Sequence, residues 1–257
     1  MEMTKGKKII VANWKMNPAT FAEARGIVAG VKRQVRKTRG IEVVVCPPSV
    51  YLSALVTKKK EILSFGAQNV FWQNGGSFTG EVSPEMLRAL GVRYVIVGHS
   101  ERRAFGESDE IVAKKVGAAL REGLTAILCV GERERREDGA YLEFLKAQIK
   151  NSLAGVGRKF LSSLVVAYEP LWAIGKSFAD AMKPHEMEVT GIFIRKVLAE
   201  LFDKEGAFRV PILYGGSVSA ENAGALLSEG RADGLLVGRE SLSAESFDEI
   251  LRAVHTA

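Results

Sequence analysis

Cysteine and histidine are scarce in this chain of 257 residues. The two cysteines, Cys46 and Cys129, each lie inside an apolar run, so we expect buried thiols rather than a disulfide or a metal pair. The three histidines, His99, His185 and His255, are scattered along the chain without metal-ligand spacing. The sequence therefore predicts neither a disulfide nor a metal site.

Long hydrophobic runs are also missing. No apolar run approaches the roughly 20 residues of a membrane-spanning helix, and the charged segment 1–8 has no signal-peptide core. The net charge is +6, but the basic clusters at 32–37 and 58–60 follow predicted helices and contain no interleaved aromatic residues. We therefore expect a soluble, cytoplasmic protein that binds neither membranes nor nucleic acid.

Short apolar runs alternate with amphipathic segments along the whole chain. Such nearly continuous runs are typical of parallel strands that are buried on both faces. The runs cover residues 8–12, 41–45, 62–65, 93–97, 125–129, 164–167, 210–213 and 234–237. Helical patterns cover residues 109–121, 141–153 and 185–201, and the expected helix N-caps include Ser83, Ser108 and Ser219.

The absence of a compositional break favours one domain, residues 1–257, folded as a single (β/α)₈ barrel. An open, doubly wound sheet is the alternative fold. That fold more often carries a glycine-rich dinucleotide loop after its first strand, whereas here the segment 13–17 reads Asn-Trp-Lys-Met-Asn.

Active residues of a parallel barrel come from the carboxyl ends of several strands. The predicted strand ends carry Asn13, Lys15, Gln68, Asn69, His99, Ser100, Glu101, Cys129, Glu169, Gly215, Gly216, Ser217 and Gly238. A cation, an imidazole, a carboxylate and two glycine-rich turns are thus expected on one rim. No Ser-His-Asp arrangement or Walker loop accompanies them.

Glu169 is the most informative of these residues. It follows a predicted strand and precedes a Pro-Leu-Trp stop and the flexible segment that begins at Gly175. A carboxylate held by a strand and covered by a movable loop suits a general base that works away from water. Taken alone, a glutamate at a strand end is more often a solvated acid.

The other rim residues complement a base. Lys15 supplies a fixed positive charge, and His99 is expected to be a neutral electrophile held by N–H groups of the turn that follows it. The turns at Gly216 and Gly238 present backbone N–H groups to a phosphate. Together these residues predict proton abstraction next to a carbonyl in a small phosphorylated sugar or ketone, without a cofactor.

Seven motifs occur in one order along nearly the whole chain. They lie at residues 13–17, 67–69, 78–83, 98–103, 129–132, 168–175 and 214–218. In these motifs the chain resembles the triosephosphate isomerase family. The resemblance implies cofactor-independent interconversion of glyceraldehyde 3-phosphate and dihydroxyacetone phosphate through an enediolate, in glycolysis and gluconeogenesis.

The resemblance also implies individual roles. Glu169 would move the proton, His99 would polarise the carbonyl, and Lys15 and Asn13 would contact substrate. Glu101 would hold Lys15. The resemblance implies three further groups of residues. Gly175, Gly216, Ser217 and Gly238 would grip the phosphate, and Ser100 and Cys129 would support the catalytic residues. Phe78 and Thr79 would lie on a loop that contacts the second subunit of a homodimer.

Two departures from the family pattern concern the phosphate grip. The lid continues as Lys176 and Ser177 where a second glycine is usual, and Arg239 follows Gly238 where the family carries paired glycines. We expect Arg239 to keep its backbone N–H available to phosphate.

Two other functions are alternatives for such a barrel: a non-catalytic barrel that binds phosphorylated metabolites, and another phosphosugar isomerase. The presence of Lys15, His99 and Glu169 argues against the first, and the Tyr-Glu-Pro-Leu-Trp lid sequence argues against the second.

Overall fold

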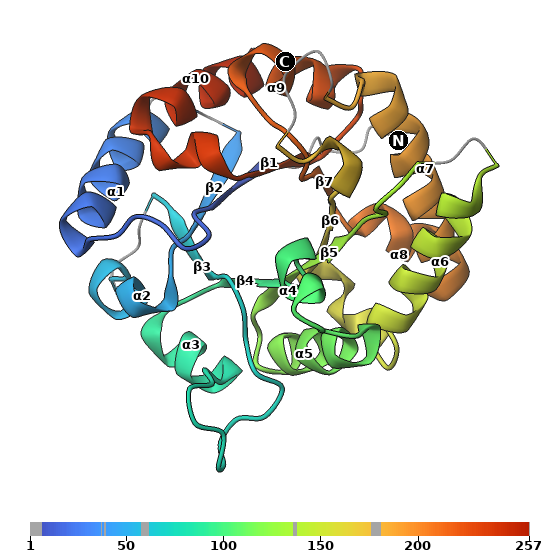
Figure 1. The fold of residues 1–257 in the computed structure, drawn as a ribbon, viewed down its shortest axis with the longest axis horizontal. Helices are drawn as coiled ribbons and strands as arrows, with labels where there is room; N and C mark the ends of the chain where they lie inside the picture. The colour runs from blue at the N-terminus through green and yellow to red at the C-terminus, as the bar shows by residue number, and fades with distance from the viewer. Residues whose placement is uncertain are drawn as a thin grey trace.

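The computed structural model of the chain describes residues 7–36, 38, 40–57, 62–135, 138–175 and 181–256, to which all structural statements below refer. Eight parallel strands close into a barrel in sequence order, and helices surround them (Figure 1). The strands are β1 (Lys8–Asn13), β2 (Ile41–Cys46), β3 (Ser64–Ala67), β4 (Tyr94–Val97), β5 (Thr125–Val130), β6 (Leu164–Tyr168), β7 (Ile212–Tyr214) and β8 (Gly234–Val237). The predicted (β/α)₈ barrel is confirmed, and the open sheet is excluded because β8 pairs with β1.

Each strand overlaps a predicted apolar run, but two strands begin two residues later than expected. β3 begins two residues later than expected, because its pairing with β2 starts at Val44 and Ser64. β7 begins at Ile212, since Pro211 has no N–H for the ladder and contributes only its carbonyl oxygen, which accepts from the Val166 N–H at 2.9 Å. Hydrophobicity locates a strand but does not locate its first hydrogen bond.

The helices follow their predicted signals. They are α1 (Phe21–Val35), α2 (Ser49–Leu55), α3 (Pro84–Leu90), α4 (Ser100–Ala104), α5 (Asp109–Arg121), α6 (Ala140–Ser152), α7 (Pro184–Leu201), α8 (Lys204–Arg209), α9 (Ala220–Ser228) and α10 (Ala244–His255). Short 3₁₀ helices are η1 (Arg158–Ser163), η2 (Leu171–Ala173) and η4 (Arg239–Leu242). Ser83, Ser108 and Ser219 are N-caps, as expected. Within the described ranges, no helix is both long enough and apolar enough to span a bilayer.

The core has two layers because strand residues alternate between the barrel interior and the helices. Ile9 and Val11 of β1 belong to the interior cluster, whereas Ile10 and Ala12 pack in the outer one. Cys46 and Cys129 lie in the interior cluster and are free and buried, so the prediction of buried thiols is confirmed. Burial raises the pKa of both thiols, which keeps them protonated at neutral pH.

One loop projects away from the barrel. The segment between β3 and α3 extends beyond the ring of helices (Figure 1). Within it Phe71 packs between two aromatic rings, with centroids 4.0 Å from Trp72 and 4.5 Å from Phe78. Phe78 remains 38% exposed. The loop is therefore ordered by its own aromatic residues and leaves apolar surface uncovered.

Barrel closure leaves no room for a side chain where β8 meets β1. A Cβ added at Gly234 would lie 1.9 Å from the carbonyl oxygen of Ile9. We expect Gly234→Ala to lower the free energy of unfolding by about 1–3 kcal/mol, because the two strands must separate. Urea denaturation followed by circular dichroism measures this change.

Gly26 provides the matched control, since it lies in α1 and nothing approaches its added Cβ within 4 Å. Gly26→Ala should raise the free energy of unfolding by roughly 0.5–1 kcal/mol. Equal urea midpoints for the two variants would show that closure at Gly234 tolerates a methyl group.

Candidate active site

A pocket of about 360 Å³ opens at the carboxyl ends of the strands. Five strands contribute to it, through the segments that follow β1, β4, β6, β7 and β8. The predicted residues that line it are Asn13, Lys15, His99, Glu169, Gly175, Gly216, Ser217, Gly238 and Arg239. The barrel thus brings together a cation, an imidazole, a carboxylate and the glycine-rich turns.

The other predicted residues lie around this pocket. Ser100 and Glu101 begin α4 and bond to residues that line it, and Cys129 is buried in the barrel interior. Phe78 and Thr79 are on the projecting loop. Lys176 and Ser177 fall outside the described residues.

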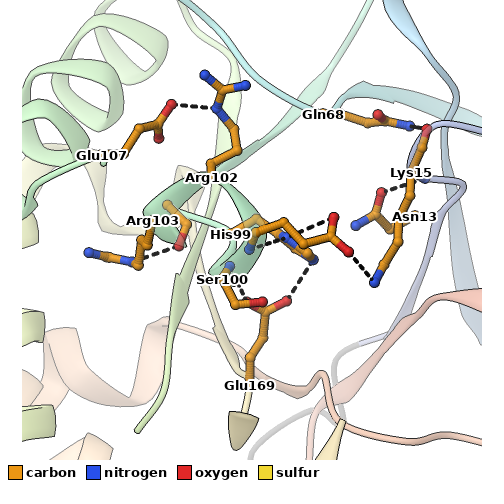
Figure 2. Close-up of polar contacts among 11 residues, drawn as sticks. Asn13, Lys15, Gln68, His99, Ser100, Arg102, Arg103, Glu107 and Glu169 are labelled. Carbon is orange, nitrogen blue, oxygen red and sulfur yellow. Dashed lines mark hydrogen bonds and ion pairs between the residues drawn. The ribbon is translucent and has the colours of Figure 1, made fainter. Parts of the chain in front are cut away.

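Lys15 is held in place through both its backbone and its side chain. Its φ of 52° is in the left-handed region, which few non-glycine residues adopt. Asn13 Oδ1 accepts its N–H at 3.1 Å, and Gln68 Nε2 donates to its carbonyl oxygen at 2.8 Å. The ammonium donates to Glu101 Oε1 at 2.7 Å, the contact that the family resemblance implies (Figure 2). The positive charge therefore has a defined position at the pocket wall.

His99 caps the N-terminus of α4 with its ring. Its Nδ1 accepts the Glu101 backbone N–H at 3.2 Å, so that nitrogen carries a lone pair and no proton. The proton of the neutral ring is then on Nε2, which lies 3.1 Å from Glu169 Oε1 (Figure 2). The local geometry thus supports an uncharged imidazole that donates through Nε2.

Glu169 follows β6 directly and is only 2% exposed. Its Oε1 faces His99 Nε2, and its Oε2 accepts the Ser100 N–H at 3.0 Å (Figure 2). Both oxygens are therefore engaged by the start of α4. The carboxylate is thus held in a defined position at the pocket wall.

Glu132 is a buried carboxylate that the sequence analysis did not select. Its Oε1 accepts from the Tyr168 hydroxyl at 2.7 Å and from Trp172 Nε1 at 2.9 Å. Burial, with a smaller contribution from Glu132, raises the pKa of the Tyr168 hydroxyl, which stays protonated as a donor. Glu132 thus ties the residues on both sides of Glu169. Its position just after a buried strand, like that of Glu169, was the available sequence signal.

The glycine-rich turns lie on the opposite side of the pocket from α4. Ser217 donates its N–H and its hydroxyl to the Ala173 carbonyl oxygen, at 3.3 and 2.9 Å. Gly238 precedes η4, so the first backbone N–H groups of that short helix start at the pocket. Gly175 has a φ of 70°, a conformation that suits glycine. The two Ser217 contacts thereby join the turn after β7 to η2.

Comparison with known proteins identifies the family. The family model described as triosephosphate isomerase matches residues 8–254. The chain is 45% identical over 247 residues to the triosephosphate isomerase of Natranaerobius thermophilus, covering 95% of each chain. It is 44% identical over 249 residues to that of Geobacter metallireducens, covering 95% of this chain and 97% of the relative. The chain belongs to the triosephosphate isomerase family.

Membership in the triosephosphate isomerase family confirms the resemblance drawn from the motifs. The match extends from β1 into α10, so it includes every strand that contributes to the pocket. Among the described residues, no three His, Cys, Asp or Glu side chains are grouped so that they would hold a metal ion.

The hydrogen bond from Glu101 to His99 generates a prediction about protonation. Because Nδ1 accepts an N–H, we expect His99 to remain neutral in the free protein at pH 7, with its proton on Nε2. Nitrogen-15 NMR of the imidazole distinguishes the two ring nitrogens. His255, which is exposed at the end of α10, serves as the internal reference. A doubly protonated His99 ring at pH 7 would contradict the assignment.

Proposed function

We propose that the pocket interconverts glyceraldehyde 3-phosphate and dihydroxyacetone phosphate through an enediolate. The placement of the Glu169 carboxylate beside the His99 imidazole, with glycine-rich turns across the same pocket, carries this proposal. As a member of the triosephosphate isomerase family, the chain is an intramolecular oxidoreductase. One carbon is oxidised while its neighbour is reduced, so the reaction needs no external electron acceptor.

Glu169 is the base in this proposal. Its carboxylate leaves the Ser100 N–H, rotates into the pocket and takes a proton from the carbon next to the substrate carbonyl. His99 Nε2–H donates to the carbonyl oxygen and stabilises the negative charge that develops there. His99 Nε2 then gives its proton to the former carbonyl oxygen and takes one from the neighbouring hydroxyl, while Glu169 returns its proton to the adjacent carbon, which completes the isomerisation.

Lys15 and the glycine-rich turns hold the substrate. The Lys15 ammonium, fixed by Glu101, adds a positive charge near the enediolate and the phosphate. The backbone N–H groups near Gly216, Gly238 and Arg239 bind the phosphate oxygens, as Gly175 does from the lid. The Ser217 N–H and hydroxyl exchange the Ala173 carbonyl oxygen for the phosphate. Asn13 contacts substrate from the end of β1. Ser100 and Cys129 support the Glu169 carboxylate from within the protein.

A homodimer completes the pocket in our proposal. A second hollow, of about 340 Å³, lies beside Lys15 and is lined by Gln68, Met16 and Phe105. Met16 is 92% exposed and Phe105 is 86% exposed, which is unusual for large apolar side chains. The projecting loop with Phe78 and Thr79 suits such a hollow on a second copy.

The proposal places the enzyme in the cytoplasm, in glycolysis and gluconeogenesis, with residues 1–257 as one domain. A non-catalytic phosphometabolite-binding barrel is not favoured, because Lys15, His99 and Glu169 share one pocket. Another phosphosugar isomerase is not favoured either, because the family match covers residues 8–254.

Removing the base tests the reaction. Glu169→Gln keeps the side-chain volume but removes proton abstraction, so kcat should fall by about 10²–10⁴-fold. Glu169→Asp withdraws the carboxylate by one methylene, and a misplacement of about 1 Å costs about 10²-fold. A coupled assay with glyceraldehyde 3-phosphate measures both variants. Wild-type turnover by Glu169→Gln would show that another group is the base.

The dimer proposal is tested at the projecting loop. Phe78→Asp places a charge on the surface expected to dock, so the variant should sediment as a monomer with reduced activity. Phe208→Asp is the control, since Phe208 is half exposed on α8, away from the loop. Analytical ultracentrifugation at micromolar protein gives the masses. A parent protein that is both monomeric and fully active would refute the dimer.

A further inference from the structure

Gly131 lies directly against the backbone of Glu169. A Cβ added at Gly131 would lie 1.8 Å from the Glu169 carbonyl oxygen and 2.5 Å from its carbonyl carbon. Glycine is therefore required at this position, and the two backbones are in van der Waals contact. Any displacement of Gly131 is transmitted to the peptide that leaves Glu169.

Hydrogen bonds on either side of Gly131 reinforce this contact. The Glu169 N–H donates to the Val130 carbonyl oxygen at 2.7 Å, and the Leu171 N–H donates to the Glu132 carbonyl oxygen at 2.9 Å. We call residues 130–132 the platform. It continues the pairing of β5 with β6 beyond the ends of the strands and supports the backbone that carries the base.

The N–H group at the centre of the platform is held by a side chain. Pairing of β4 with β5 ends at Val97 and Leu128, because the chain then turns through Gly98 into α4. The Gly131 N–H lies beyond that ladder, and it donates to Gln148 Oε1 at 2.8 Å. A buried N–H without an acceptor destabilises the folded protein. The Gln148 side chain therefore substitutes for a missing strand.

The packing of α6 does not by itself explain why Gln148 is buried. It is 5% exposed on a face of α6 whose other buried residues include Leu145 and Ile149. Placing an amide there is unfavourable unless its polar atoms are paired. The pairing found is with the platform and so with the segment that carries Glu169.

We propose that Gln148 is a positioning residue for the base. It does not line the pocket of about 360 Å³, and it acts through Gly131. Glu169 must rotate from Ser100 toward substrate, and this rotation delivers its carboxylate to one place only if its backbone is held still. The inference rests on the proposed role of Glu169. The platform also carries Glu132, which holds Trp172, so the Pro-Leu-Trp segment that follows Glu169 shares the same support.

Gln148→Leu tests the proposal, because it keeps similar volume and removes the acceptor. We expect kcat to fall by about 10–100-fold, since a misplacement of about 1 Å costs about 10²-fold. The KM for glyceraldehyde 3-phosphate should change by less than about threefold, because the phosphate grip is untouched. Binding of a phosphorylated hydroxamate that mimics the enediolate should weaken with kcat, while binding of glycerol 3-phosphate should not.

Leu145→Val is the matched control. It loosens the same helix at a fully buried apolar position without touching the platform, so it should lower the melting temperature and leave kcat unchanged. Gln148→Asn is a second test variant, which keeps the amide but withdraws it by one methylene. It should lose kcat as Gln148→Leu does.

The outcomes separate this inference from the proposed function. Parental kcat in both Gln148 variants, or an equal loss of kcat in Leu145→Val, would assign Gln148 a purely structural role and overturn the inference. A parent protein that fails to isomerise glyceraldehyde 3-phosphate would overturn the proposed function and this inference with it. A loss of kcat and of hydroxamate binding confined to the Gln148 variants would support it.

Discussion

Pairing of β8 with β1 is the constraint on which the rest of the structure depends. The Ile9 N–H donates to the Asp233 carbonyl oxygen at 3.2 Å, just before β8 begins. The Asp233 carboxylate in turn accepts from the Ile212 N–H at 2.9 Å and from Arg195 at 2.6 Å. Closure leaves the described sheet without an edge, so the carboxyl ends of all eight strands meet on one rim. Side chains from opposite ends of the chain therefore share one pocket.

The start of α4 organises the charges on that rim. Two consecutive residues, Ser100 and Glu101, serve three different groups. The Glu101 N–H sets the proton position on His99, the Ser100 N–H holds the Glu169 carboxylate, and the Glu101 carboxylate holds Lys15. α4 is only five residues long, but its first N–H groups have no partner within the helix and are free to bind side chains. The N–H groups that lack a partner within α4 therefore orient the residues of the site.

Much of the fold was predictable because burial leaves a pattern in the sequence. Strands covered on both faces read as continuous apolar runs, and eight of them in alternation with helices indicated a barrel. The predicted starts of β3 and β7 were less accurate. The first ladder bond of β3 depends on its neighbour β2, and that of β7 depends on Pro211. Lys15, His99 and Glu169 could be selected because each follows a predicted strand, and strand ends converge in a barrel.

The supporting contacts could not be predicted in this way. Gln148 has the sequence surroundings of any polar residue on an amphipathic helix, and its partner Gly131 lies in a different element. Glu132 reaches Tyr168 and Trp172 only because β5 and β6 are adjacent. The amino-acid sequence by itself determined which elements form and which side chains stand at their ends, since both follow from local periodicity. Tertiary structure alone decided the resting position of Glu169 and the backbone that supports it, because both depend on distances between segments remote in sequence.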